Sequence, residues 1–535
     1  MNSVVTETIE ASAFPRRNGD WVDYDEERMK PAVRISVVVA VLVAALAPNA
    51  VAQSSCPRPH WAATWAGVPS DASAGSDIAD VFSASGDLKE PVNNSTVRAV
   101  LTPTMAGSTV RVHLSNRFGT VPVTFSRTTI ARKGDGAALG GTPATLTFGG
   151  KRAVTVAPGR DVVSDAARFG YGAFQTLAVT TYVSSNAGKP TEHFTARQTS
   201  YQTAAGTGDH STDSSSAAFS QHTTTRPFVT GLDVRTNKPA GAVVTFGDSI
   251  TDGYQGQSPA GVPETKEGID ANGRWPDVLG RRLRAARIPL SVVNAGISGN
   301  RVLRDPSQGG QRDTNGPAAI HRLGVDVLRQ SGVTTVILLE GGNDLGQDPA
   351  AGSQEIIDGY RQLITRLHAA HLRVLQVTLT PMGGAGRRYG TAETNAKRQA
   401  INTWIRTKSP ADGVIDFDKA VRDPADPSRI NPKYDGGDHL HYNLAGYKRL
   451  GDTVRLSQLR RPVAKRRVTF RVPRRYRTGL KRVYVVVGKH HIARSSRASV
   501  TATLPLSRVV VRLRLVRPGH RAVTLLRIVH ACPTR

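Results

Sequence analysis

The spacing of apolar and polar positions changes twice along the chain. Between residues 56 and 237, short runs of alternating apolar and polar residues are separated by turns rich in Gly, Asp, Asn and Ser. These runs predict strands at 96–101, 108–116, 144–148, 152–156 and 177–183. Alternation is typical of strands with one buried face, and their length and spacing favour a β-sandwich. The Ser/Thr/Gly-rich passage 203–225 is expected to be an exposed loop leading to the next domain.

From residue 242 to residue 457 the pattern becomes that of an α/β domain. Five strand-like runs, at 243–246, 290–295, 334–340, 372–380 and 413–417, alternate with helical patterns. In the helical pattern 355–371, Ile356, Tyr360, Leu363 and Leu367 fall on one face. Strands that alternate with helices predict a five-stranded parallel sheet covered on both sides.

The last segment, 461–535, returns to strand patterns: RVTFRV, RVYVVV, RVVVRLRLV and AVTLLRIV. Within 511–515 arginines alternate with aliphatic residues, so one face can pack while the other is basic. We expect a small β-domain here. It holds 20 Lys and Arg and no Asp or Glu, which leaves +8 of the net charge of +28 for the rest of the chain.

The first 52 residues indicate export. The apolar run 35–47 is too short to cross a bilayer but suits a signal-peptide core, since Lys30 and Arg34 precede it and Ala50-Val51-Ala52 follow it. We predict a signal peptide over 29–52, cleavage after Ala52 and a secreted protein. Residues 1–28 are interpreted as a misassigned start ahead of Met29. The alternative is a true extension on a type II membrane anchor.

Only two cysteines exist, Cys56 and Cys532, and they lie near the two ends of the predicted mature chain. An exported chain permits a disulfide between them. Two separate thiols or pairing between chains are the alternatives, and the spacing of the two residues does not decide among the three. Gln53-Ser54-Ser55 lacks the apolar residue of a lipoprotein signal, so lipidation of Cys56 is not expected.

The stretch VVTFGDSITDGY, residues 243–254, runs from a strand through Gly247 and Asp248 to Ser249 and then toward a helix. A serine at such a junction is either a helix cap or a nucleophile at the carboxyl end of a parallel strand. A nucleophile needs a base, and YDGGDHLHYNLAGY offers two candidate pairs: Asp438 with His441, and Asp435 with His439. Both histidines stand close enough in sequence for a carboxylate to orient the imidazole.

Two further strand ends offer donors for an oxyanion. Gly299 in GISGN presents a bare backbone N–H, and Asn343 in GGND presents a side-chain amide. Glycine and asparagine are also ordinary turn residues, so each signal is weak alone. Because the carboxyl ends of parallel strands share one edge of the sheet, the nucleophile, donors and base are expected at one crevice.

Over residues 242–457 the sequence resembles the SGNH (GDSL-type) hydrolases, in the blocks GDSITDG, NAGISGN, EGGND and DHLH. The resemblance implies a three-layer, flavodoxin-like domain in which Ser249 is the nucleophile, His441 the base and Asp438 its orienting carboxylate. It further implies an oxyanion hole of the Ser249 and Gly299 N–H groups and the Asn343 amide, with no metal and no other cofactor.

The stretches GRWPDVLGRRL, NAGISGNRVL and DFDKAVRDPADPSRI are similar to a bacterial branch of exported arylesterase-like and acetylxylan-esterase-like proteins, whose members also carry a β-sandwich before the hydrolase domain. Tyr442 and Gly342 depart from that branch, which often has proline and isoleucine there, and are expected to alter the pocket rim. Asp248 and Asp344 are interpreted as structural hydrogen-bonding residues and Glu340 as a packing or network residue.

The combined expectation is an exported serine esterase, a monomer, acting on acetyl-like esters that include acylated polysaccharide. The alternatives are a lysophospholipase or lipase, and a non-catalytic wall- or glycan-binding protein. The segment 461–535 predicts binding to anionic wall polymers, acidic polysaccharides or anionic lipid surfaces, and export argues against a specific nucleic acid partner. The alternative for this segment is that its arginines only solvate the outer face.

Overall fold

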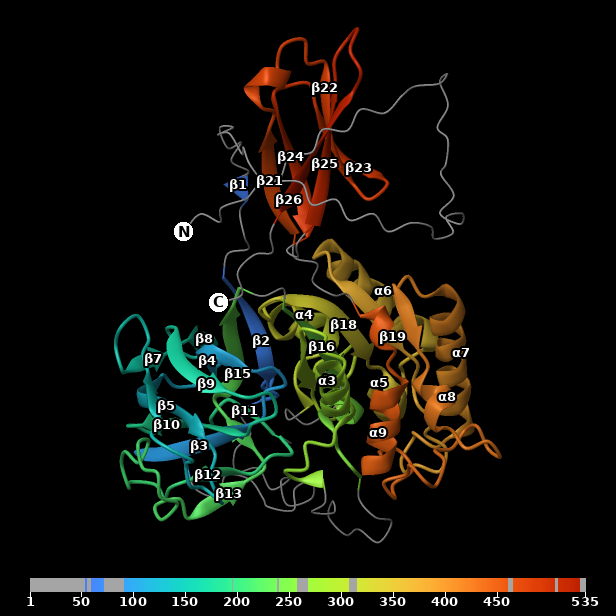
Figure 1. Cartoon of the computed structure of the whole chain (residues 1–535). Coiled ribbons are helices and arrows are strands. Elements are labelled where there is room, and N and C mark those ends of the chain that lie inside the picture. Colours follow the sequence, from blue (N-terminus) through green and yellow to red (C-terminus); the bar gives the residue numbers. More distant parts are fainter. Residues whose placement is uncertain are drawn as a thin grey trace, which may run out of the picture. The chain divides into compact units, whose positions relative to one another are not determined.

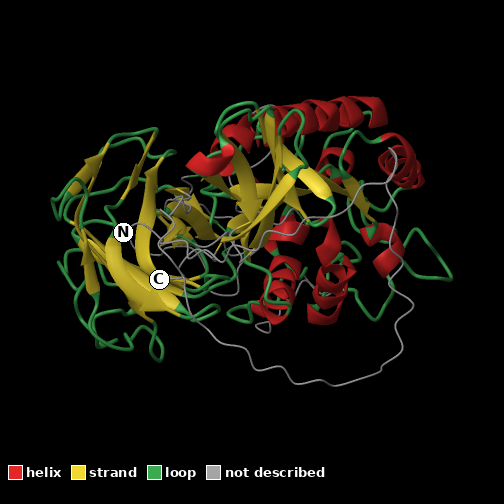
Figure 2. Cartoon of the chain, turned by 45° about the horizontal axis from the view of Figure 1, so that its top comes forward, coloured by secondary structure: helices red, strands yellow, loops and turns green. Residues whose placement is uncertain are grey.

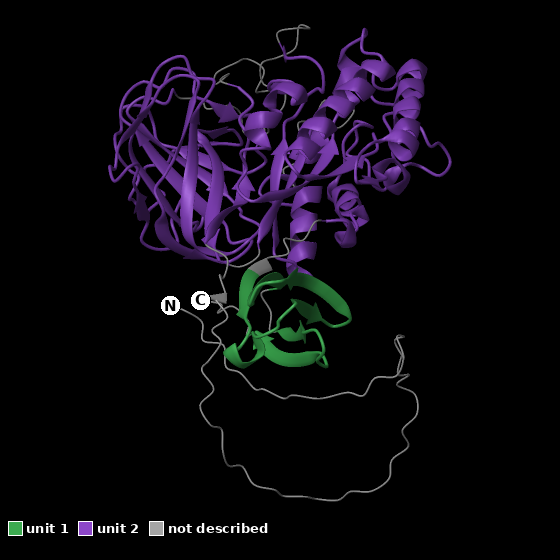
Figure 3. Cartoon of the chain, turned by 90° about the horizontal axis from the view of Figure 1, so that it is seen from above, with its two compact units in different colours: residues 1–58, 463–535 green, residues 59–462 purple. Residues whose placement is uncertain are grey.

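A computed structural model of the chain describes residues 53–54, 59–71, 91–194, 196–237, 240–256, 268–306, 315–459, 465–505 and 509–529. The chain divides into two compact units, coloured separately in Figure 3: residues 59–462 form one, and residues 1–58 with 463–535 form the other. The predicted signal peptide and both cysteines lie outside the described residues. No helix within the described ranges is long and apolar enough to cross a membrane.

Two antiparallel sheets form the first part of the larger unit (Figure 1). One has the order β13-β12-β3-β10-β5-β6, with β7 beside β5, and the other the order β2-β15-β4-β8, with β9 beside β4. Phe125 and Val179 of the first sheet and Val112 and Leu232 of the second belong to one buried cluster. Two sheets that share a core form a β-sandwich, so the strand-rich pattern is matched in this region.

The strands of this region are β2 (His60–Ala66), β3 (Ser95–Leu101), β4 (Gly107–Asn116), β5 (Val123–Arg132), β6 (Ala144–Leu146), β7 (Val154–Val156), β8 (Arg160–Val163), β9 (Ala167–Tyr171), β10 (Leu177–Val183), β12 (Ser200–Gln202), β13 (Gln221–Thr223) and β15 (Val229–Thr236). A separate two-stranded ladder joins β11 (Glu192–His193) to β14 (Arg226–Pro227).

The passage 203–225 is mostly irregular, but the expectation that it is exposed is wrong for part of it. Ser211 is fully buried, and its carbonyl accepts a hydrogen bond from Thr129 Oγ1 at 2.7 Å. The buried guanidinium of Arg98 donates to the carbonyl of Asp213 at 2.8 Å and lies 3.8 Å from the ring centroid of Phe219. The passage is held against the sheet because a buried arginine on β3 needs acceptors.

The second part of the larger unit is the α/β domain. Its sheet has the order β17-β16-β18-β19-β20 with every pair parallel, which confirms the predicted five-stranded parallel sheet. The order is that of flavodoxin-like folds. The strands are β16 (Gly241–Gly247), β17 (Leu290–Gly296), β18 (Val333–Leu339), β19 (Arg373–Val377) and β20 (Gly413–Ile415).

The helices are α2 (Ser249–Asp252), α3 (Trp275–Ala285), α4 (Ala319–Asp326), α5 (Gly342–Gln347), α6 (Ser353–Ala369), α7 (Ala392–Lys408), α8 (Phe417–Val421) and α9 (Leu444–Thr453), followed by the 3-10 helix η4 (Leu456–Gln458). Figure 2 shows them in red beside the yellow sheet strands. The predicted helix at 355–371 is α6.

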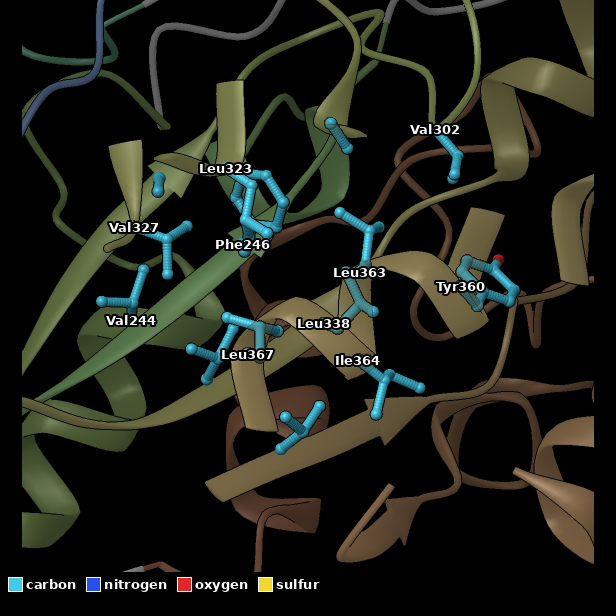
Figure 4. Packing of buried hydrophobic residues seen from close by; sticks show 14 of the residues in the cluster. Val244, Phe246, Val302, Leu323, Val327, Leu338, Tyr360, Leu363, Ile364 and Leu367 are labelled. Atoms are coloured by element: carbon cyan, nitrogen blue, oxygen red, sulfur yellow. The ribbon is translucent and has the colours of Figure 1, made fainter. Parts of the chain in front are cut away.

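Alternate residues of the parallel strands enter two different cores, which gives the three layers. Val244 and Phe246 pack with α4 and α6 in one cluster, part of which Figure 4 shows. Val243 of the same strand packs in the other cluster, with Leu279 of α3 and Leu450 of α9. Strands buried on both faces explain the near-continuous apolar runs in the sequence.

The β-sandwich covers the edge strand β17 of the parallel sheet. Thr104 Oγ1 accepts from the Val292 N–H at 2.8 Å and donates to the Val292 carbonyl at 3.0 Å, and Gly67 forms a bridge with Asn294. Val68, which follows β2, belongs to the apolar core of the α/β domain. An edge strand presents unpaired backbone groups, and here the β-sandwich pairs those of Val292 and bridges Asn294.

The smaller unit has two sheets around a core of its own. One sheet has the order β1-β21-β24 and the other β23-β22-β25-β26. Its elements are β1 (Gln53–Ser54), β21 (Lys465–Arg471), the 3-10 helix η5 (Arg474–Tyr476), β22 (Arg482–Val487), β23 (His490–Ser495), β24 (Ser499–Pro505), β25 (Val509–Val516) and β26 (Val523–Val529). Strands are therefore present where the C-terminal patterns predict them.

Candidate functional site

Ser249 stands where β16 passes into α2. Asp248, not Ser249, caps the helix, because its carboxylate accepts from the N–H of Ile250 at 3.0 Å. A Cβ atom on Gly247 would lie 2.2 Å from Thr251 Oγ1 and 2.5 Å from the Leu339 carbonyl, so only glycine fits the turn. Because Asp248 supplies the helix cap, the Ser249 hydroxyl can form a hydrogen bond with another group.

Ser249, His441 and Asp438 are joined in one hydrogen-bonded chain. Ser249 Oγ lies 2.8 Å from His441 Nε2, and His441 Nδ1 lies 2.6 Å from Asp438 Oδ2. Because a carboxylate only accepts, Nδ1 carries the proton and Nε2 of the neutral ring is free to accept from the serine. Burial would raise the pKa of Asp438, but the charge and hydrogen bonds of His441, with the N–H of Leu440, lower it to about 2.

The competing pair also forms, but away from Ser249. His439 Nδ1 lies 2.6 Å from Asp435 Oδ2, and the same carboxylate accepts from the N–H of Gly437 at 2.8 Å. The side chain of His439 is 42% exposed, whereas that of His441 is 10% exposed. Asp435 with His439 therefore shapes the turn, and Asp438 with His441 reaches the serine.

The expected oxyanion donors take different places. Asn343 Nδ2 donates to the carbonyl of Asn300 at 2.9 Å, while its Oδ1 accepts from Tyr389 Oη at 2.6 Å and from Gln347 Nε2 at 2.9 Å. With Oδ1 held by two donors, the amide has a single orientation, and its second Nδ2 hydrogen is free for a ligand. Ser249 and Asn343 line the same cavity.

Gly299 adopts φ +80°, and a Cβ atom there would lie 2.3 Å from Asn315 Oδ1, so the turn requires glycine. It is absent from the cavity lining. Its neighbour Ser298 ties the turn to α2, because Ser298 Oγ donates to Asp252 at 2.8 Å. Within the described residues, the N–H groups of Ser249 and Gly299 have no acceptor.

The cavity is lined by Asp248, Ser249, Ile250, Leu339, Gly342, Asn343, Leu379, Thr380, Met382, Tyr389 and Leu440, and with its open mouth it measures about 340 Å³. Gly342, which is expected to alter the pocket rim, belongs to this lining. Tyr442 does not: it is fully buried and packs edge-on against Tyr447, so the expected effect on the pocket rim is wrong for this residue.

Sequence reasoning missed Arg322. This buried side chain on α4 donates to the carbonyls of Gly247 at 3.0 Å and Ala295 at 2.8 Å, to Asn300 Oδ1 at 2.9 Å and to Glu340 Oε1 at 3.0 Å. It thus joins the carboxyl ends of three neighbouring strands. An arginine on a helix gives no sequence signal of this kind, since most face solvent.

Three buried carboxyl groups surround these strand ends, in the structural roles expected for them. Asp344 accepts from the N–H groups of Val302 at 2.8 Å and Leu303 at 3.1 Å. Burial raises the pKa of Asp344 and of Asp248 to about 6, and it raises the pKa of Glu340 well above its usual range although Arg322 opposes the shift. Glu340 is the network partner of Arg322.

An α/β domain with a serine, an imidazole and a carboxylate joined at the carboxyl end of its sheet has the architecture of a hydrolase. Residues 245–449 match the model of the GDSL-like Lipase/Acylhydrolase family. The chain therefore carries a domain of this family and is a carboxylic ester hydrolase of the SGNH type. No curated protein sequence matches the chain.

Solved structures similar to the chain include three esterases or lipases. The native aryl esterase of M. smegmatis is 20% identical to this chain; the match covers 40% of this chain and 95% of the esterase, with a TM-score of 0.31. A carbohydrate acetylesterase family member from Sinorhizobium meliloti is 18% identical, and the match covers 40% of this chain and 94% of that protein with a TM-score of 0.31. A GDSL-like lipase from Bacteroides thetaiotaomicron is 17% identical, and the match covers 41% of this chain and 87% of that protein with a TM-score of 0.29.

The contact between Tyr389 and Asn343 gives a first prediction. Tyr389→Phe keeps the ring but removes a donor that holds the Asn343 amide, so kcat for a soluble ester should fall about 3- to 10-fold with little change in KM. Steady-state kinetics measure both constants. Tyr182→Phe is the matched control, because Tyr182 Oη donates to Asn94 Oδ1 at 2.7 Å in the β-sandwich. An unchanged kcat in Tyr389→Phe would show that the hydroxyl does not position the amide.

Proposed function

We propose that this chain is an exported serine esterase that hydrolyses short-chain, acetyl-like carboxylic esters, including those of acylated polysaccharide. The observation that carries the proposal is the 2.8 Å contact between Ser249 Oγ and His441 Nε2, with Asp438 behind the imidazole. Export rests on the sequence of residues 29–52 alone.

The geometry supports an acyl-enzyme mechanism. Ser249 Oγ attacks the ester carbonyl while His441 Nε2 takes its proton, and the same proton passes to the leaving alcohol. Asp438 stays ionised and stabilises the imidazolium that forms. Water, activated by His441, then hydrolyses the acyl-enzyme, and Ser249 recovers its proton.

The developing oxyanion requires donors beside Ser249. In this mechanism the Ser249 and Gly299 N–H groups and Asn343 Nδ2 supply them. Asn343 already lines the cavity with Ser249, and the Gly299 turn is tied to α2 through Ser298. Loss of one such donor typically removes about 3 to 4 kcal/mol of transition-state stabilisation.

The catalytic roles predict a set of variants. Ser249→Ala and His441→Ala should lose nearly all ester hydrolysis, and Asp438→Asn should be crippled by about 10⁴-fold in kcat, because the wrong imidazole tautomer is favoured. His439→Ala is the control, since its pair with Asp435 does not reach Ser249. The test is the hydrolysis rate of each variant on p-nitrophenyl acetate, with circular dichroism to verify that the variant folds. Substantial activity in Ser249→Ala, or a dead His439→Ala beside an active His441→Ala, would overturn the assignment.

The cavity favours a small acyl group. Among the residues that line it, the apolar wall is formed by Ile250, Leu339, Leu379, Met382 and Leu440. A long acyl chain would need a longer apolar channel to bury each methylene group.

A chain-length series of p-nitrophenyl esters tests this preference. We expect kcat/KM to peak at acetate or propionate and to fall beyond butyrate, because longer chains remain exposed. A maximum at octanoate or longer would instead identify a lipase or lysophospholipase. No hydrolysis of any member of the series would favour a binding protein and would contradict the proposal.

The smaller unit supports a second proposed role, binding to anionic polymers outside the cell. We define its cationic face as Arg482, Tyr484, Arg494, Arg512 and Arg514. Tyr484 pairs across the sheet with Arg494 on β23 and Arg514 on β25, so the three side chains share one face. The hydrogen bond from Arg482 and the charges of the neighbouring arginines lower the pKa of the Tyr484 phenol.

We expect a wall polymer to bind to the cationic face, because the side chains on the opposite face of the same strands pack into the core of the unit. Val483, Leu513 and Leu525 point into the core of the unit. Arg482, Arg494 and Arg512 are exposed and Arg514 is half-buried. Cations around an aromatic ring attract polyanions, and no acidic side chain between 461 and 535 offsets them. The charge is thus presented on one face of a sheet.

Two triple variants of equal charge test the face. Replacing Arg482, Arg494 and Arg514 with Ser should abolish retention of the full chain on an anionic wall preparation at physiological salt and leave ester hydrolysis unchanged. Replacing Arg471, Arg475 and Arg497, which are exposed outside the face, should reduce retention only slightly. Wild-type retention should fall steeply with salt, since screening lengths are about 8 Å at 0.15 M. Equal losses from both triples would show that net charge alone is responsible.

A further inference from the structure

His193 connects the β-sandwich to the helix that carries Ser249. It ends β11, whose ladder with β14 fixes its backbone. Its side chain is 6% exposed and bridges two groups: Nδ1 lies 2.6 Å from the carbonyl oxygen of Val68, and Nε2 lies 3.0 Å from Asp252 Oδ1. His193 does not line the cavity beside Ser249.

Asp252 is the residue through which His193 reaches the site. It is the last residue of α2, one turn after Ser249, and it is 2% exposed. Its Oδ2 accepts from Ser298 Oγ at 2.8 Å and from the Ser298 N–H at 3.2 Å. Ser298 directly precedes Gly299, so one carboxylate fixes both the nucleophile helix and the turn that offers an oxyanion donor.

Both ring nitrogens of His193 face acceptors. A backbone carbonyl accepts only, and so does a carboxylate that already receives two bonds from Ser298. His193 thus lies between two buried acceptors, the Val68 carbonyl oxygen at Nδ1 and the Asp252 carboxylate at Nε2. Removing one donor to a buried carboxylate is costly, because water does not replace the lost hydrogen bond there.

A second contact from the same part of the β-sandwich supports the base. The Arg197 guanidinium lies 4.5 Å from the ring centroid of Tyr254. The Tyr254 ring in turn meets the His441 ring edge-on, with centroids 4.7 Å apart. The β-sandwich thus packs behind the base as well as behind the nucleophile helix.

We propose that His193 is a positioning residue for ester hydrolysis, and that the β-sandwich is for this reason a working part of the active site. His193 holds Asp252, and Asp252 keeps Ser249 and the Ser298-Gly299 turn at the separation that the transition state requires. The proposal rests on the proposed function of Ser249.

Two amide variants separate the two hydrogen bonds of His193. In His193→Gln the amide nitrogen takes the place of Nε2 and can still donate to Asp252. In His193→Asn it takes the place of Nδ1 and donates only to Val68. We expect His193→Gln to stay within about 3-fold of wild-type kcat, and His193→Asn to lose up to about 100-fold in kcat with little change in KM, because small misplacements of reacting groups are costly.

His113→Asn is the matched control. His113 Nε2 lies 3.0 Å from Asp233 Oδ2, and Asp233 accepts from Ser331 Oγ at 2.7 Å, so this pair also links the β-sandwich to the α/β domain. Ser331 precedes β18 and therefore lies at the amino ends of the parallel strands, whereas Ser249 lies at their carboxyl ends. His113→Asn should therefore leave kcat unchanged even where it lowers the thermal unfolding temperature as much as His193→Asn does.

Equal kcat losses in the two His193 variants, or a wild-type kcat in His193→Asn, would overturn the positioning role. If His193→Asn does not fold, Ser298→Ala tests the same link from the other side: it removes one donor to Asp252 and should lower kcat about 3- to 10-fold. An unchanged kcat in Ser298→Ala would then count against the proposal. Full activity in Ser249→Ala would instead refute the proposed function itself. The two failures therefore give different results.

Discussion

The catalytic end of the sheet depends on the hydrogen bonds that the guanidinium of Arg322 donates. It is buried, and it meets the carbonyls of Gly247 and Ala295 and the side chains of Asn300 and Glu340. A buried guanidinium that lost these acceptors would be strongly destabilising, so the ends of β16, β17 and β18 must stay together. Ser249 follows β16 by two residues, and Asn343 donates to the carbonyl of Asn300. Arg322 therefore helps to position both the nucleophile, through Gly247, and the Asn343 amide, through Asn300.

The β-sandwich adds the constraint that Arg322 does not supply. Thr104 and Gly67 pair the exposed side of the edge strand β17, and Val68 enters the core of the α/β domain. His193 then reaches α2 itself. Removing the β-sandwich would uncover the sheet edge and remove the contact of His193 with Asp252 at the same time, so folding and catalysis share these contacts. The strands beneath the cationic face of the smaller unit pack around a core of their own.

Local patterns predicted most of the fold but only part of the site. The five parallel strands lie within a few residues of the apolar runs, because strands buried on both faces need continuous apolar sequence. The two carboxylate–histidine pairs could not be separated by spacing, and both form at 2.6 Å. What distinguishes them is the 2.8 Å contact of His441 with Ser249, 192 positions away. The passage 203–225 looked exposed because its composition is polar, yet Arg98 draws part of it onto the sheet.

By itself the sequence determined the periods of the three regions, the residue types at the strand ends and the excess charge of the last 75 residues, because each of these is a property of neighbouring residues. Only the tertiary structure decided which histidine meets Ser249, which tyrosine holds Asn343 and how His193 reaches Asp252. Those partners lie between 46 and 192 positions apart. A buried polar group takes whichever donor or acceptor packing brings within about 3 Å, and no spacing along the chain encodes that choice.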